Sequence, residues 1–556
     1  MLPEIIHAQQ IVLLLKARGI DTIVISPGSR NAPLTIGFTN DPFFKCYSIV
    51  DERCASHVAL GMAQQERRAV VLLCTSGSAV LNYYPAVAEA FYSEIPLIIL
   101  SADRPPHKID IGDGQTINQH EVYHNHIIMD ATLKMIATAS DRERLATNER
   151  IMNKALNLIQ SHPGPVHLNV PFEEPLYGQV NEQDITVKVV TSNKIEKSTI
   201  PADFYETWES SSRKMVILST LSPAIISNEE IGFLLDDPSV LVLSEVSSNI
   251  TTPRLVWSID TLIAPIEAQP EVIKDLRPTI VLTIGGMIVS KKIKQYLRDF
   301  ETTFHYHIGN RRAYDTFFKL SGHYKMTPSG FLQQLGKRST ISTYQKFWTS
   351  IFESRLKKRT YYLNQIPWCD LKVFQLIFDS LPDNIVLQLG NSSTVRYAQL
   401  FKMNKSHKIF SNRGTSGIEG CSSTAIGAAM ASTLQTILIT GDISFFYDSN
   451  ALWNYYIPSN FKILLINNSG GGIFRILPSN KEEENFHTFF ETRHELDASH
   501  LCAMHGFGYH RVGDESAFAK AYSSFIHNDS KPQLLEIFTP TEVNDKVLLN
   551  YFEFIR

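Results

Sequence analysis

Residues 436–442 read TILITGD, and residues 462–468 read KILLINN. Each stretch is a run of β-branched and aliphatic residues that ends in small or polar ones. Such short, continuous apolar runs are typical of strands that are buried on both faces, as in parallel sheets. Because segments with helical periodicity separate the runs, we predict a doubly wound parallel sheet with helices between its strands.

The same alternation extends outward from this stretch and defines two more series of strands. The first series follows a helix that ends near residue 18 and comprises TIVIS at 22–26, YSIV at 47–50, VVLLC at 70–74, PLIIL at 96–100 and VHLNV at 166–170. The second comprises MVILS at 215–219, VLVLSEV at 240–246 and TIVLTIGG at 279–286, and the third begins with NIVLQLG at 384–390 and IFSNRG at 409–414. A polar stretch at 174–205 indicates a linker, and 340–365 indicates a helix. We therefore predict an α/β protein with three doubly wound parallel-sheet domains, over 1–180, 200–340 and 365–556.

Composition limits the class of protein. The chain has 556 residues, of which 44% are hydrophobic, 10% aromatic and 19% charged. These values fit a water-soluble globular protein and exclude a disordered, collagen-like or coiled-coil chain. The net charge of −4 leaves no general basic field for nucleic acid or an anionic membrane. No apolar stretch approaches the ~18 residues of a membrane span, no signal-peptide pattern opens the chain, and the six cysteines form no CxxC pair. We expect a cytoplasmic protein without a membrane span or a nucleic-acid partner.

The ends of 436–442 and 462–468 carry candidate metal ligands. Asp442 and Asn468 follow two strands, and the turn SGGG at 469–472 adds backbone carbonyls. Carboxylate, amide and carbonyl oxygens are the ligands that Mg²⁺ prefers, and this ion often accompanies phosphates. Glycines let the backbone approach a phosphate, and a helix that starts near Ser444 or Ile473 would add partial positive charge. The alternative is a pair of polar turns without a ligand.

Other familiar signatures are absent or weak. GxGxxG does not occur, and GFLQQLGKRS at 330–339 has one residue too many for a P-loop. HEVYH at 120–124 fits HExxH, the pattern that places two zinc ligands and a general base on one helical face. Gly112 and Gly114 lie just upstream, and no apolar helical stripe frames the motif. A histidine-rich loop is therefore favoured over a zinc hydrolase.

The GD pair followed 26 residues later by NN resembles the diphosphate- and metal-binding motif of the thiamin diphosphate (ThDP) enzymes. YSIVDERCASHVALG at 47–61 places Glu52 at a helix start, where that family keeps a glutamate on the cofactor's aminopyrimidine. Alone, Glu52 is equally a helix-start acid. Further matches are SPGSRNAPL at 26–34, TSGSA at 75–79, NYYPAVAEA at 82–90, SADRPP at 101–106, SNRGTSGIEG at 411–420, GDIS at 441–444 and NNSGGGIF at 467–474. Together these are similar to one ThDP family, the 2-succinyl-5-enolpyruvyl-6-hydroxy-3-cyclohexene-1-carboxylate (SEPHCHC) synthases of menaquinone biosynthesis.

This resemblance implies a function and an assembly. The domains would be pyrimidine-binding, central and diphosphate-binding in chain order, with ThDP and Mg²⁺ or Mn²⁺ as cofactors. The enzyme would decarboxylate 2-oxoglutarate and add the remaining carbanion to isochorismate in a 1,4-addition. The two halves of each site would come from different chains, which makes a homodimer the minimum and a homotetramer an alternative.

The resemblance also implies roles for individual residues. Glu52, Ile418 and Gln115 would be catalytic, with Ile418 as the apolar wedge that bends the cofactor, although core packing is an alternative role for it. The cofactor would be bound by Glu52, Ile418, Asp442, Ile443, Ser444, Asn468, Gly470, Gly471, Ile473 and Phe474. The metal ligands would be Asp442, Asn468 and Gly470.

Both implied substrates are dicarboxylates, so the site needs local cations. By resemblance, Ser392, Arg396 and Arg413 face 2-oxoglutarate. Ser29, Arg30, Arg104 and Gln115 face isochorismate, and Lys291 and Lys292 stand where the family has Lys followed by Arg. Any one arginine is alternatively part of a structural ion pair. Ile443 also departs from most ThDP enzymes, which have glycine there.

Three alternatives remain open from the sequence. The nearest is another ThDP carboligase or decarboxylase, such as a relative of acetolactate synthase. The others are the HExxH zinc hydrolase and an α/β binding module without enzymatic activity.

Overall fold

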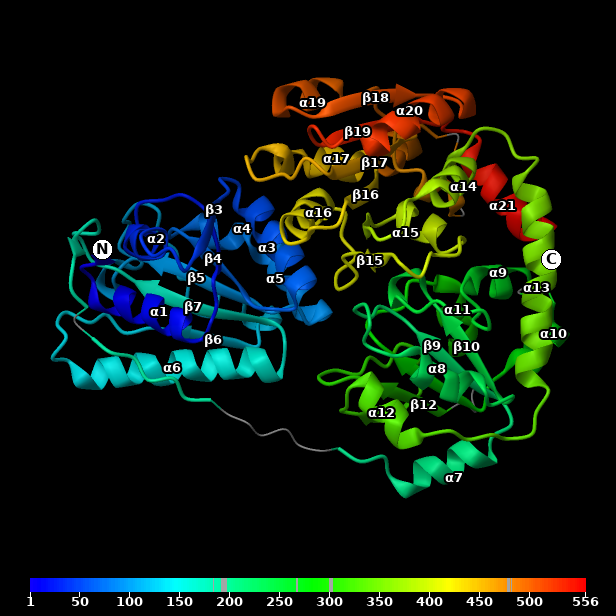
Figure 1. The fold of residues 1–556 in the computed structure, drawn as a ribbon, viewed down its shortest axis with the longest axis horizontal. Helices are drawn as coiled ribbons and strands as arrows, with labels where there is room; N and C mark the ends of the chain where they lie inside the picture. The colour runs from blue at the N-terminus through cyan, green and yellow to red at the C-terminus, as the bar shows by residue number, and fades with distance from the viewer. Residues whose placement is uncertain (184, 192–197, 267–268, 300–303, 478–480, 482) are drawn as a thin grey trace. The chain divides into compact units, whose positions relative to one another are not determined.

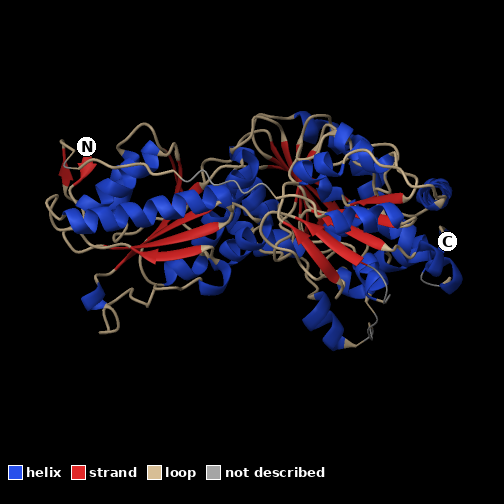
Figure 2. Cartoon of the chain, turned by 90° about the horizontal axis from the view of Figure 1, so that it is seen from below, coloured by secondary structure: helices blue, strands red, loops and turns tan. Residues whose placement is uncertain are grey.

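The computed structural model describes residues 1–183, 185–191, 198–266, 269–299, 304–477, 481 and 483–556. Their strands form three parallel sheets and one short antiparallel pair, with helices packed beside each sheet (Figure 1). A view at right angles shows the strands lying between helices (Figure 2). The predicted α/β class with three parallel sheets is confirmed.

The first sheet has the strand order β3-β2-β4-β5-β7-β6, and its neighbours pair in parallel. Its strands are β2 (Thr22–Ile25), β3 (Lys45–Ser48), β4 (Val70–Cys74), β5 (Leu97–Asp103), β6 (Met129–Thr132) and β7 (Pro165–Pro171). The helices of this part are α1 (Ile6–Ala17), α2 (Ala32–Thr39), α3 (Glu52–Glu66), α4 (Ser78–Asn82), α5 (Tyr84–Ser93) and α6 (Arg142–Ser161). The antiparallel pair joins β1 (Leu2–Pro3) to β8 (Gln179–Val180).

The second sheet has the order β10-β9-β11-β12-β13 and is parallel throughout. Its strands are β9 (Lys214–Leu218), β10 (Val240–Ser244), β11 (Ile280–Ile284), β12 (Phe304–Ile308) and β13 (Leu320–Tyr324). The helices are α7 (Ala202–Ser210), α8 (Asn228–Leu235), α9 (Ile259–Ile263), α10 (Pro270–Leu276), α11 (Lys291–Arg298), α12 (Pro328–Leu335) and α13 (Tyr344–Leu363). Alternate residues of β9 enter two different hydrophobic clusters, one on each face, because both faces of a parallel sheet are covered.

The third sheet has the order β15-β14-β16-β17-β19-β18. Its strands are β14 (Val386–Leu389), β15 (Lys408–Phe410), β16 (Thr436–Gly441), β17 (Phe461–Asn467), β18 (Gly508–Val512) and β19 (Gln533–Phe538). The helices are α14 (Asp370–Ser380), α15 (Ser393–Ala398), α16 (Cys421–Met430), α17 (Asp442–Tyr447), α18 (Ile473–Ile476), α19 (Ser499–His505), α20 (Glu515–His527) and α21 (Asn544–Phe554). The order makes β16 and β17 neighbours, so the turns that follow them lie at one edge of the sheet.

Each predicted strand overlaps an observed one, and one predicted strand is displaced by two residues along the sequence. The strand predicted at 47–50 is β3 at Lys45–Ser48, because the chain leaves the sheet before Asp51, the N-cap of α3. The helix predicted over 340–365 is α13. The three domain boundaries stay predictions.

By proximity, the chain forms two compact units that are not continuous in sequence. One comprises Met1–Ile195, Gly414–Thr433 and Tyr447–Phe461, and the other comprises Glu196–Arg413, Leu434–Phe446 and Lys462–Arg556. Within the first unit α16 packs closely on α3. A Cβ at Gly61 would overlap the carbonyl oxygen of Thr424, and one at Gly427 would overlap that of Val58. The two glycines therefore allow the close approach of these helices.

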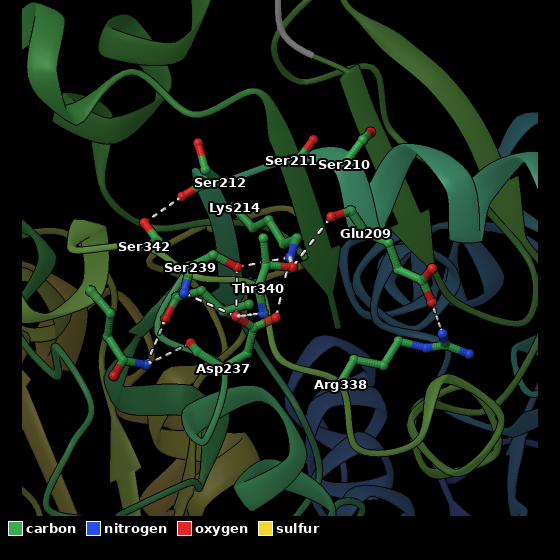
Figure 3. Close-up of polar contacts among 12 residues, drawn as sticks. Glu209, Ser210, Ser211, Ser212, Lys214, Asp237, Ser239, Arg338, Thr340 and Ser342 are labelled. Atoms are coloured by element: carbon green, nitrogen blue, oxygen red, sulfur yellow. Dashed lines mark hydrogen bonds and ion pairs between the residues drawn. The ribbon is translucent and has the colours of Figure 1, made fainter.

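A buried ion pair lies at the start of β9 in the second sheet (Figure 3). The ammonium group of Lys214 donates to Asp237 Oδ2 at 3.1 Å, Ser239 Oγ at 2.7 Å and Thr340 Oγ1 at 2.9 Å. It also lies over the ring of Trp208, 5.1 Å from the centroid. The network ties the connection before α13 to the sheet, and every hydrogen of the ammonium has a partner.

None of the helices in the described ranges is both long and apolar enough to span a membrane.

Candidate active site

The predicted metal ligands lie together at the carboxyl ends of β16 and β17. Asp442 and Asn468 are 2% and 7% exposed. The backbone N–H of Gly470 donates to Asp442 Oδ2 at 3.0 Å, which joins the turn after β17 to the carboxylate after β16. The N–H of Ile443 donates to Asp442 Oδ1 at 2.7 Å, and Ser444 is buried beside it. This edge of the sheet therefore holds a buried carboxylate within reach of a glycine turn.

The two ends of the Asn468 side-chain amide have different surroundings. Its Nδ2 donates to Asp370 Oδ2 at 2.9 Å, whereas its buried Oδ1 has no hydrogen-bond partner among the described residues. Burial raises the pKa of Asp370 to about 6, and the hydrogen bonds from Thr539 and Asn468 oppose that effect. Because a buried carbonyl oxygen without a donor is costly, Oδ1 is suited to a cation.

Glu491 packs against the turn at 470–472 and holds it in place. A Cβ at Gly470, whose φ is 152°, would lie 2.7 Å from the carbonyl oxygen of Glu491. The N–H of Gly471 donates to the same oxygen at 2.6 Å. The carboxylate of Glu491 is fully buried and accepts hydrogen bonds from Arg475, His487 and Arg493. The backbone at Gly470 can therefore adopt its path only without a side chain.

These residues fit a divalent metal and a diphosphate. Asp442, the free Oδ1 of Asn468 and a carbonyl of the Gly470 turn are hard oxygen ligands. Helix α18 begins at Ile473, as predicted, whereas α17 begins at Asp442, two residues before the predicted Ser444. Phe474, in the first turn of α18, is 36% exposed.

Glu52 opens α3 directly after the N-cap Asp51, whose side chain accepts the N–H of Cys54 at 3.2 Å. The Glu52 side chain is half-buried, and Asn82 Nδ2 lies 3.5 Å from its Oε2. Burial raises the pKa of Glu52, and the charge of Asp51 acts in the same direction. A carboxyl with a raised pKa is suited to share a proton with a ring nitrogen.

Two of the arginines predicted to bind isochorismate flank one carboxylate. Arg30, which is 2% exposed, donates to Glu174 Oε1 at 2.9 Å and to the carbonyl of Phe172 at 3.1 Å. Arg104 NH1 lies 3.9 Å from the same Glu174 oxygen. Glu174, whose side chain is 62% exposed, was not among the residues predicted from the sequence. Its carboxylate thus lies beside both guanidinium groups.

Several hydrogen bonds support the exposed loop of Gln115. Arg104 donates to the carbonyl of Gly114 at 2.9 Å, and Ser76 Oγ donates to the carbonyl of Gln115 at 3.0 Å. Gln119 accepts the N–H of Gly77 at 2.9 Å. Gln115 has a positive φ of 52°, and Ser29 is exposed at the end of the first sheet. Hydrogen bonds to backbone carbonyls therefore join Arg104 and Ser76 to the Gln115 loop.

The residues predicted to bind 2-oxoglutarate form a second cationic cluster. Arg413 donates to Asn391 Oδ1 at 2.7 Å, and Arg396 donates to the carbonyl of Ser392 at 2.5 Å. Burial lowers the pKa of Arg396, and the neighbouring charge of Arg413 adds to that effect. Two arginines that repel each other favour an anionic ligand.

The central sheet adds Glu245 and Lys294 to this cluster. Glu245 is buried at the end of β10 and accepts the N–H groups of Val289 and Ser290 at 2.7 and 2.8 Å. Burial raises its pKa to about 7, against the charge of Arg413. Lys291 and Lys292, predicted to bind substrate, are exposed in the first turn of α11.

Lys294 lies further along α11 and was missed. Burial lowers its pKa, Glu245 opposes this effect, and Arg413 and Arg396 add to it. The half-buried Lys294 is thus close enough to interact with the charges of the predicted 2-oxoglutarate cluster. Its place in the sequence, three residues after Lys291, did not indicate this proximity.

The HEVYH segment lacks the geometry of a zincin site. Residues 120–123 form turns, and a 3₁₀ helix starts at His124. Glu121 has a positive φ of 55°, and Tyr123 is fully buried. His120 and His124 therefore do not share one face of an α-helix, which the zinc hydrolase alternative requires.

Other residues at the metal edge had no sequence signal. His494 Nε2 lies 3.3 Å from Asp442 Oδ2, and Asp370 contacts Asn468 across 98 positions of sequence. Neither belongs to a spaced motif, so only the folded chain brings them to the site.

Comparison with known proteins shows the family of the chain. Residues 7–126 match the family described as "Thiamine pyrophosphate enzyme, N-terminal TPP binding domain", and 390–537 match "Thiamine pyrophosphate enzyme, C-terminal TPP binding domain". A 2-succinyl-5-enolpyruvyl-6-hydroxy-3-cyclohexene-1-carboxylate synthase of Flavobacterium psychrophilum is 50% identical over 99% of both chains. The chain belongs to the SEPHCHC synthase family.

Two further relatives of the same name extend this result. The SEPHCHC synthase of Flavobacterium johnsoniae is 47% identical over 99% of both chains. That of Christiangramia forsetii is 48% identical over 99% of this chain and 98% of its own. In this SEPHCHC synthase fold, the segment 7–126 contains β2 to β5 of the first sheet, and the segment 390–537 contains β15 to β18 and most of β19 of the third.

Proposed function

We propose that this chain is a ThDP-dependent SEPHCHC synthase, which decarboxylates 2-oxoglutarate and adds the resulting four-carbon unit to isochorismate. Its relatives carry this name over essentially the whole chain. The observation that carries the proposal is the side-chain oxygen of Asn468, which has no partner in the described part of the chain, at the same sheet edge as the buried Asp442 and the Gly470 turn. These groups would hold Mg²⁺ or Mn²⁺ with the cofactor's diphosphate.

When bound, ThDP supplies a nucleophilic carbon and an electron sink for decarboxylation. Glu52 would hold a proton between its carboxyl and the aminopyrimidine, which its raised pKa favours. Ile418 would hold the cofactor bent, and Gly471, Ile473 and Phe474 would line its diphosphate end. Gln115 would orient the second substrate.

The two arginine groups would bind different substrates. Arg396 and Arg413, with Ser392, would meet the carboxylates of 2-oxoglutarate, and Lys291 and Lys292 would extend that field. Arg30 and Arg104, with Ser29, would meet isochorismate and displace Glu174 from their guanidinium groups.

We also infer a homodimer or homotetramer that works in the cytoplasm. Support for the assembly is the family resemblance, in which each site combines two chains. Support for the compartment is the set of six cysteines, which form no disulfide among the residues that the structure describes.

One assay tests the proposed function. Purified protein with ThDP and Mg²⁺ is given 2-oxoglutarate with and without isochorismate. We expect a single turnover of CO₂ release from 2-oxoglutarate alone, and repeated turnover with a succinyl-bearing product only with both substrates. Turnover of pyruvate instead would favour an acetolactate-synthase-like carboligase. Failure to turn over any 2-oxo acid would favour a binding module.

A further inference from the structure

Glu89 lies in α5 and contacts a segment that follows it by 325 positions. Its Oε1 accepts the backbone N–H of Gly414 at 2.7 Å. Its Oε2 accepts the N–H of Thr415 at 2.7 Å and the hydroxyl of Thr415 at 2.9 Å. Ser93 donates to Oε1 at 2.6 Å. Glu89 is 2% exposed, so one buried carboxylate accepts four hydrogen bonds.

This arrangement needs an accepting oxygen at both ends of the Glu89 side-chain carboxyl group. Each oxygen meets one backbone N–H group, which can only donate. A glutamine would turn its NH₂ group toward one of these N–H groups and leave it unsatisfied inside the protein. The role of Glu89 thus depends on its two accepting oxygens as well as its size.

Gly414 fits the same contact by its lack of a side chain. A Cβ there would lie 2.6 Å from the carbonyl oxygen of Glu89 and 3.0 Å from its Oε1. The first of these is backbone of α5 and cannot rotate away. The absence of a side chain at Gly414 therefore lets the segment lie directly against α5.

The other end of the segment is held by α3. Gly420 has a positive φ of 74°, and a Cβ there would overlap the ring of His57. His57 Nδ1 lies 2.9 Å from the carbonyl of Arg53 in the same helix. Since α3 packs against α5, residues 414–420 are fixed at both ends by one helix pair.

We propose that Glu89 is a positioning residue for Ile418, acting through the segment 414–420. This inference rests on the proposed function, because Ile418 is there the side chain that bends ThDP. Glu89 itself touches neither substrate nor cofactor in this proposal. Its carboxylate fixes the backbone four residues before Ile418, and His57 fixes it two residues after.

The test compares Glu89→Gln with the matching amide substitution of another buried carboxylate, Asp237. Asp237 is 1% exposed and also accepts four hydrogen bonds, from Lys214, Thr340 and two groups of Ser239 (Figure 3). Asp237→Asn therefore disturbs a buried carboxylate in the central sheet without touching 414–420. Gly414→Ala is the second variant, because it displaces the segment and leaves the charge in place.

Hydrogen exchange of the protein without cofactor is measured first. We expect the peptide covering 414–420 to exchange about 10-fold faster in Glu89→Gln and Gly414→Ala, and at the wild-type rate in Asp237→Asn. Wild-type exchange of this peptide in both test variants would overturn the clamp.

The Kd for ThDP with Mg²⁺ is measured next by calorimetry. We expect it to rise about 10-fold in Glu89→Gln and Gly414→Ala and to stay near the wild-type value in Asp237→Asn. Equal weakening in all three variants, or faster exchange with unchanged Kd, would overturn the positioning role. A wild-type chain that fails to bind ThDP would overturn the proposed function, while the exchange result would still stand for the clamp.

Discussion

Asn468 donates its Nδ2 hydrogen to Asp370 Oδ2 at 2.9 Å, and this bond fixes which end of the amide is left for a ligand. Thr539 donates to the other oxygen of Asp370 at 2.6 Å. Since an ionised carboxylate only accepts hydrogen bonds, the amide nitrogen must face Asp370 and Oδ1 must face away. Asp370 therefore orients Asn468, the proposed metal ligand, without being a proposed ligand itself.

Asp370→Asn should weaken metal binding. The new amide can donate toward Asn468, so the Asn468 side chain loses its fixed orientation, and we expect Mg²⁺ affinity to fall by about 10- to 100-fold. Calorimetric titration of Mg²⁺ in the presence of ThDP measures the change. Asp379→Asn is the control, because Asp379 is exposed near the end of the same helix. Equal affinities in the two variants would contradict the orienting role.

Glu52→Gln should separate cofactor binding from turnover. The amide retains the size of the side chain but cannot exchange a proton with the aminopyrimidine. We expect turnover to fall by at least ~10²-fold, about 2.7 kcal/mol of transition-state stabilisation, with ThDP binding retained. Steady-state kinetics and calorimetry provide the two readouts. Glu66→Gln, at the far end of α3, is the control, and near-normal turnover of Glu52→Gln would refute the assignment.

The sequence predicted the parts of this fold that local chemistry determines. The runs at 436–442 and 462–468 became β16 and β17, and the polar residues after them meet at one edge as expected. Strands with interrupted apolar runs were missed. β12 reads FHYHI and β13 reads LSGHY, and their histidines and glycine conceal the pattern of a buried strand.

Long-range contacts lay outside the reach of sequence reasoning. Glu89 meets Gly414, and Asp370 meets Asn468, only because strand order and helix packing bring them together. The packing of α16 on α3 was also unforeseen, although Gly61 and Gly427 were visible as glycines inside helices. An isolated helical glycine indicates close packing without naming the partner.

Glu245→Gln should remove a pH dependence of stability. The folded pKa of Glu245 is about 7, above the ordinary value of 4.5, so the neutral form is favoured in the fold. Its stabilising contribution is complete below pH 4.5 and is lost as the pH rises through 7. Relative to the variant, wild-type protein should lose up to about 3 kcal/mol of unfolding free energy over this range.

Urea denaturation of both proteins at several pH values between 4.5 and 8 measures this difference. Comparison of the pair cancels the titration of other groups, since the charges near Glu245, those of Arg413, Asp260 and Lys294, are present in both. Parallel curves across the whole range would mean that Glu245 stays ionised in the fold.

The two arginine pairs should affect different halves of the proposed reaction. Arg396→Ala and Arg413→Lys should slow CO₂ release from 2-oxoglutarate. The change to lysine replaces a planar fork, which donates to Asn391, with a point charge. Loss of a bidentate charge contact should cost on the order of 2 to 4 kcal/mol, a factor of about 30 to 1000. Arg30→Ala and Arg104→Ala should instead raise the KM for isochorismate and leave CO₂ release largely intact.

A single-turnover measurement of CO₂ release without isochorismate isolates the first half of the reaction, and product formation with both substrates reports on the second. Arg142→Ala, at an exposed arginine of α6, is the control for loss of positive charge alone. The pairing of Arg30 and Arg104 with Glu174 adds a sharper comparison, because Glu174→Gln should lower the KM for isochorismate by freeing both guanidinium groups. If Arg30→Ala abolishes CO₂ release while Arg413→Lys leaves it unchanged, the two ends of the site are reversed and both substrates have been placed wrongly.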